Sequence, residues 1–102
     1  MADRIYTISE ISAIVAPVAR EYGVGRLALF GSYARGEATT DSDIDLRLID
    51  GGALRGYFKL SGFQLALQDR FGVNVDVLPS DSLSKGFLSE IQKDEVIIYE
   101  KR

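Results

Sequence analysis

FGSYARGEATTDSDIDL, residues 30–46, is the stretch that decides the fold of this chain. Gly31 and Ser32 follow an apolar run, and a second apolar run then begins with carboxylates at alternate positions. Side chains two residues apart on a strand point to the same face. Asp43 and Asp45 should therefore lie on one face of the strand, with Cα atoms roughly 6–7 Å apart. The stretch therefore predicts a place where phosphates and divalent metal ions are held side by side.

Composition limits the chemistry that such a site can use. The chain has 102 residues, 46% of them hydrophobic and 26% charged, which is typical of one globular domain, and we expect residues 1–102 to form it. It contains neither cysteine nor histidine, so thiolate nucleophiles, zinc–cysteine sites and a histidine base are excluded. Catalysis must rely on carboxylates, hydroxyls, Lys, Arg or bound metal. The net charge of −3 argues against a general nucleic-acid binder.

The sequence predicts neither a signal peptide nor a membrane span. The N-terminus, Met1-Ala2-Asp3-Arg4, has no signal-peptide pattern, and no apolar run is long enough to span a bilayer. We therefore expect a soluble cytoplasmic protein without a membrane partner.

The periodicity of apolar residues predicts an α/β fold with a small mixed sheet flanked by helices. Thr7 and Glu10 have the spacing of a capping box that opens a helix over residues 8–22. On the strand over residues 43–49, alternation sets three apolar side chains against Asp43, Asp45 and Arg47. The remaining predicted elements are strands over 26–30, 73–78 and 96–99 and helices over 53–71 and about 83–91. We expect the aromatic residues of the 53–71 helix to be core or interface: Tyr57, Phe58, Phe63 and Phe71.

Asp76 is the natural third carboxylate, because it lies opposite the valine face of a strand expected beside the 43–49 strand. Carboxylates that point the same way repel one another unless a cation lies between them. Oxygen-only ligands favour Mg²⁺ or Mn²⁺ over zinc. Gly31 would let the backbone approach an anion, and Ser32 offers a hydroxyl and an N–H.

The sequence does not match two better-known motifs that it partly resembles. Gly31 and Gly36 have the spacing of a P-loop, but Glu37 stands where its lysine belongs. The Asp41, Asp43, Asp45 run imitates an EF-hand, but Leu46 and Gly52 occupy the required Gly and Glu positions.

Several of these residues could instead have purely structural roles. The aspartates could be charges that protect an edge strand, and Ser32 could be only a helix cap. Arg35 could contact phosphate or pair with Glu37 on the surface.

The spacing of the motif resembles that of a known superfamily. Gly31-Ser32, ten intervening residues, Asp43-Ile44-Asp45 and a later Asp76 are similar to the nucleotidyltransferases with a DNA polymerase β-like fold. The longer string GSYARGEATTDSDIDL resembles the minimal, single-domain branch of that superfamily, the MntA-like antitoxins of HEPN/MNT toxin–antitoxin pairs.

The resemblance implies a function and roles for the residues. Gly31 and Ser32 would bind the triphosphate of ATP, and Asp43 and Asp45 would hold two Mg²⁺ ions. Asp76 would hold the metal on the acceptor side and help to deprotonate the acceptor. The reaction would transfer AMP to a tyrosine of a HEPN ribonuclease toxin and silence it. Two alternatives remain: an antitoxin that acts by complex formation alone, and a nucleotidyltransferase for a small molecule. The oligomeric state is left open.

Overall fold

The computed structural model describes residues 4–101; Met1 to Asp3, on which the reading of the N-terminus partly rests, lie outside it. The first helix, α1, runs over Ile8–Glu21. Its capping box is confirmed: Thr7 Oγ1 accepts from the Glu10 N–H at 3.0 Å, and Glu10 Oε1 accepts from the Thr7 N–H at 2.8 Å. The helix ends one residue earlier than predicted, with Tyr22 as C-cap.

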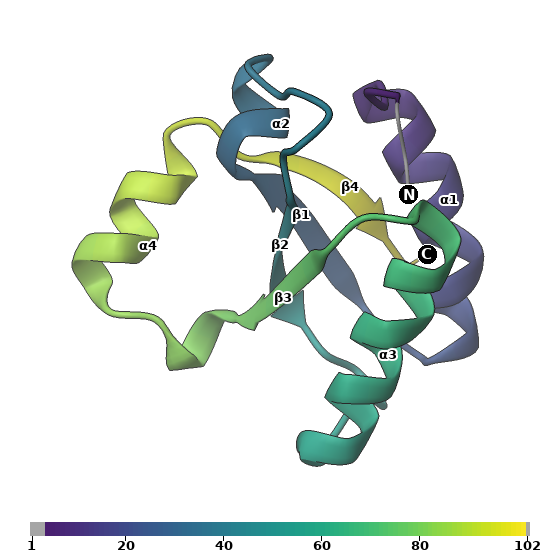
Figure 1. The fold of residues 1–102 in the computed structure, drawn as a ribbon. Coiled ribbons are helices and arrows are strands. Elements are labelled where there is room, and N and C mark those ends of the chain that lie inside the picture. The colour runs from purple at the N-terminus through teal and green to yellow at the C-terminus, as the bar shows by residue number, and fades with distance from the viewer. Residues whose placement is uncertain (1–3, 102) are drawn as a thin grey trace.

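Four strands form one mixed sheet in the order β3-β2-β1-β4, which confirms the predicted sheet (Figure 1). The strands are β1 (Arg26–Phe30), β2 (Ile44–Asp50), β3 (Val75–Pro79) and β4 (Val96–Glu100). β1 is antiparallel to both β2 and β4, whereas β2 and β3 are parallel. A short helix, α2 (Gly31–Arg35), follows β1 directly and fills the connection to β2.

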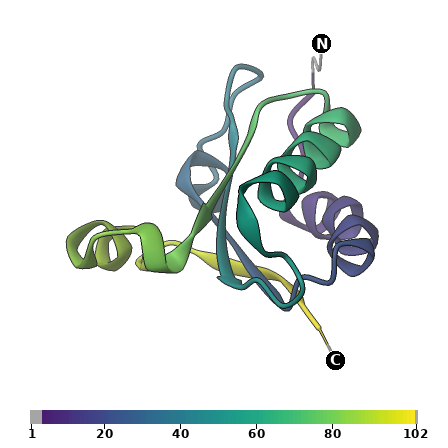
Figure 2. The same cartoon turned by 90° about the horizontal axis from the view of Figure 1, so that it is seen from below.

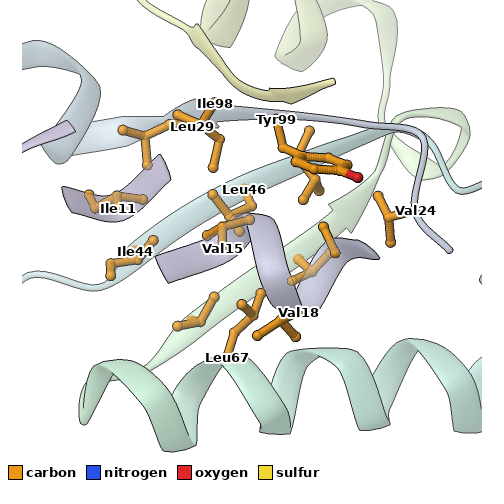
Figure 3. Close-up of a cluster of buried hydrophobic side chains, with 14 of the residues drawn as sticks. Ile11, Val15, Val18, Val24, Leu29, Ile44, Leu46, Leu67, Ile98 and Tyr99 are labelled. Carbon is orange, nitrogen blue, oxygen red and sulfur yellow. The ribbon is translucent and has the colours of Figure 1, made fainter. Parts of the chain in front are cut away.

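The core lies between one face of the sheet and two helices, α1 and α3 (Gly56–Phe71). Apolar side chains of α1, α3 and the strands meet there, as Figure 3 shows for Val15, Leu46 and Leu67. The opposite face carries a 3₁₀ turn, η1 (Ser80–Ser82), and α4 (Lys85–Gln92), which projects away from the sheet (Figure 2). No helix within residues 4–101 has the length and apolarity that crossing a membrane requires.

The prediction for α3 was wrong about where the helix begins. The helix begins at Gly56 instead of residue 53, because the chain first makes a turn in which the Leu54 N–H donates to the Gly51 carbonyl at 2.8 Å. Of the aromatic residues expected to be core or interface, Tyr57 and Phe58 are 77% and 89% exposed, so they are not core, and a place in an interface stays a prediction for them. Phe63 and Phe71 are buried, as predicted.

Side chains of α3 cover the outer edge of β3. Gln68 Oε1 accepts from the Val75 N–H at 3.2 Å, and Gln64 Oε1 accepts from the Val77 N–H at 3.0 Å. Unpaired edge groups invite another strand to pair, so the two glutamines close this edge. They also fix α3 along β3, which carries Asp76.

Candidate active site

Strand pairing brings the predicted carboxylates together. Asp45 is the register partner of Asp76 across the parallel pair β2–β3 and of Phe30 across β1–β2. Asp45 and Asp76 are both partly buried. Asp43 lies one residue before β2 and is exposed, so it flanks this pair at the start of the strand.

Gly31 lies against one of these carboxylates. It opens α2 with φ +76°, and a Cβ built on it would lie 2.3 Å from Asp45 Oδ2. Only glycine combines this backbone conformation with so close a carboxylate. The Gly-Ser turn therefore begins beside Asp45, and Ser32, the next residue of α2, is partly buried.

Within residues 4–101, the negative charge of the three aspartates is only partly balanced by neighbouring side chains. Burial, and then the charges of Asp76 and Asp43, raise the pKa of Asp45 to about 6, whereas Arg35 lowers it only weakly. Strongly raised carboxyl pKa values of this kind, with charged neighbours, gather at functional sites.

Of the two alternatives predicted for Arg35, the structure shows the surface ion pair with Glu37. Its Nε donates to Glu37 Oε1 at 2.9 Å, and that hydrogen bond raises the pKa of the guanidinium. Both side chains are largely exposed, and such pairs contribute little to stability. A contact between Arg35 and phosphate stays a prediction.

The donor set fits a hard divalent cation, although its geometry is loose. In the described part of the chain, no three acidic side chains converge closely enough to hold a metal ion. The charges of Asp43 and Asp76 nevertheless raise the pKa of Asp45, and all three offer carboxylate oxygens, the ligands that Mg²⁺ prefers. A cation among them would relieve the repulsion that the structure leaves unbalanced.

Arg47 is the residue whose part in the site region the sequence did not reveal. It shares the polar face of β2 with Asp45, yet it is only 6% exposed. Its guanidinium binds Glu95 and the Ser80 hydroxyl. The sequence does show a charged residue, Arg47, inside a largely apolar strand. Its partner Glu95 is 48 residues away, and local sequence patterns do not reveal pairs at that separation.

The fold and this arrangement define a nucleotidyltransferase domain. A family model described as the nucleotidyltransferase domain matches residues 11–99, and the chain belongs to that family. The resemblance drawn from the Gly-Ser and Asp-x-Asp spacing is thereby confirmed.

The chain is also similar to individual proteins of this family and to solved structures. The chain is 31% identical over 96 residues to protein adenylyltransferase MntA of Thermococcus cleftensis, covering 90% of this chain and 96% of that protein. A solved structure described as a minimal nucleotidyltransferase superposes with a TM-score of 0.72 at 26% identity, covering 89% and 95% of the two chains. A third structure, of a tri-AMPylated Shewanella oneidensis HEPN toxin in complex with its MNT antitoxin, gives a TM-score of 0.70 at 14% identity, covering 93% and 74%. At that identity the likeness concerns the fold.

Proposed function

We propose that this chain is an antitoxin protein adenylyltransferase. It takes AMP from ATP and transfers it to a tyrosine hydroxyl of a cognate HEPN toxin, with residues 1–102 working as one minimal domain. The observation that carries the proposal is the meeting of Gly31, Asp45 and Asp76 at the start of two parallel strands. The curated relative that is named a protein adenylyltransferase supports the choice of reaction.

Each residue has a part in this reaction. Gly31 and Ser32 bind the triphosphate, and Arg35 turns from Glu37 to the same phosphates. Asp43, Asp45 and Asp76 would hold two Mg²⁺ ions, which when bound would neutralise the α-phosphate and lower the pKa of the acceptor hydroxyl. The tyrosine oxygen forms a bond to the α-phosphorus, the bond from that phosphorus to the pyrophosphate oxygen breaks, and Asp76 helps to take the phenolic proton.

The shape of the site supports a protein as acceptor. Asp43 and Arg35 are exposed, whereas Asp45 and Asp76 are only partly buried, so the site reaches the surface. A small acceptor needs an enclosing pocket, whereas a folded partner brings its own walls. This favours a macromolecular substrate over a small molecule.

Loss of the aspartates separates catalysis from simple complex formation. The variant Asp43→Ala/Asp45→Ala is co-expressed with the cognate toxin, and cell growth and toxin mass are measured. We expect the toxin to remain unmodified and cells to stop growing, although the complex still forms. Full neutralisation by this variant would show that binding alone is the mechanism.

A further inference from the structure

Arg47 forms a buried ion pair behind the site. Its Nε donates to Glu95 Oε2 at 2.8 Å, its Nη2 donates to the other oxygen of that carboxylate, and its Nη1 donates to Ser80 Oγ at 2.7 Å. The side chains of Arg47 and Glu95 are 8% and 12% exposed. A two-pronged guanidinium–carboxylate pair of this kind fixes orientation as well as charge.

The two partners of Arg47 lie at the two ends of the segment that connects β3 to β4. Ser80 follows β3 and Glu95 precedes β4, and residues 80–95, here called the arm, comprise η1, α4 and their connections. Figure 2 shows α4 projecting from the sheet on the side away from α1 and α3. One guanidinium on β2 therefore fastens both ends of the arm.

The middle of the arm contacts the residue that leads into the phosphate turn. Phe87 of α4 meets Phe30 edge to face, with ring centroids 6.3 Å apart and an angle of 88° between the planes. Phe30 is 6% exposed, and Phe87 covers it while remaining 44% exposed itself. Phe30 is both the N-cap of α2 and the register partner of Asp45.

We propose that Arg47 is a positioning residue that holds the arm so that Phe87 keeps Phe30 and the Gly31-Ser32 turn in place for the nucleotide. The inference rests on the proposed function for its kinetic consequence. Arg47 does not touch the nucleotide; it acts through the arm. The arm has little else to hold it, because Ile91 is the one buried residue of α4. Lysine would be a poor replacement for Arg47, because an ammonium lacks the planar fork that binds both Glu95 oxygens in a fixed orientation.

The test compares Glu95→Gln, Ser80→Ala and Phe87→Ala with Glu100→Gln. The control removes a carboxylate from the exposed pair with Arg26, whose Nε–Oε2 distance is 3.3 Å. Transfer to the cognate toxin is measured against ATP concentration, and backbone amides are followed by NMR with hydrogen exchange. Phe87→Ala and Ser80→Ala leave no buried charge unpaired, so they decide the matter if Glu95→Gln does not fold.

We expect the three arm variants to raise the KM for ATP about tenfold and to change kcat by less than about twofold. Their α4 amides should exchange faster, and the Gly31 and Ser32 amides should shift. Glu100→Gln should change none of these. Unchanged Gly31 and Ser32 amides, or an equal loss in the control, would overturn the proposal. If the wild-type chain transfers no AMP, the proposed function fails, and the amides still decide whether Arg47 positions the turn.

Discussion

At the scale of single residues, the site depends on an absent side chain. Gly31 has φ +76°, and a Cβ at this position would force the Asp45 carboxylate to move. Gly36, five residues on, has φ +74°, and a Cβ added there would meet nothing within 4 Å. The two glycines share a backbone conformation and differ in what surrounds them.

This difference gives a matched pair of variants. Gly31→Ala and Gly36→Ala should each lose about 1–2 kcal/mol of unfolding free energy from the left-handed backbone. Gly31→Ala should also displace Asp45 and lower AMP transfer by about a hundredfold, because a small misplacement at a reacting centre is costly. Urea unfolding and a transfer assay measure both effects. Similar transfer rates for the two variants would contradict the assignment of Gly31 to the active site.

Asp45 should make the metal-free protein less stable as pH rises. Its pKa is about 6 in the folded chain against 3.8 ordinarily, so the folded state holds more protons between these values. Stability from this group is therefore full below about pH 4 and falls as pH rises through 6. The melting temperature of Asp45→Asn, measured against wild type, should gain most at pH 7.5 and least at pH 4.

Addition of Mg²⁺ provides the complementary test of the same group. Bound cation should raise the wild-type melting temperature at pH 7.5, because a ligand that binds only the folded state stabilises it. Asp45→Asn should respond much less. An equal Mg²⁺ response in both proteins would argue against Asp45 as a ligand.

At the scale of elements, α3 is a structural support for the strand that carries Asp76. Gln68→Leu should cost about 1–3 kcal/mol, because it leaves the N–H of Val75 buried and unpaired. Gln92→Leu, on the exposed part of α4, is the matched control and should cost much less. Urea unfolding at neutral pH measures both. Equal losses would mean that the edge contact contributes nothing to stability.

The elements also show why sequence predicted some features and missed others. Period-two alternation in Ile44, Leu46 and Leu48 follows from burial of one face, and the structure buries all three. The start of α3 could not be predicted, because it depends on a turn fixed by the Ala53 N–H donating to the Gly23 carbonyl, thirty positions earlier. Likewise the aspartates were found from local spacing, whereas the Arg47–Glu95 pair needs the folded topology.

At the scale of the whole molecule, the sheet divides two tasks between its faces. One face packs on α1 and α3 and forms the core. The other carries Asp45, Arg47 and the arm, with the three aspartates toward the starts of β2 and β3. A partner bound on this second face would leave the core undisturbed, which is consistent with the proposal that the acceptor is another folded protein.

The central claim is that this chain transfers AMP to its partner, and the intact mass of the cognate toxin tests it most directly. The purified chain, Mg²⁺ and toxin are incubated with each of the four nucleoside triphosphates in turn, alongside Asp43→Ala/Asp45→Ala. We expect ATP to add whole AMP units to a toxin tyrosine, and the variant to add none. An unchanged toxin mass with every nucleotide, while the wild-type chain still neutralises the toxin, would contradict the claim.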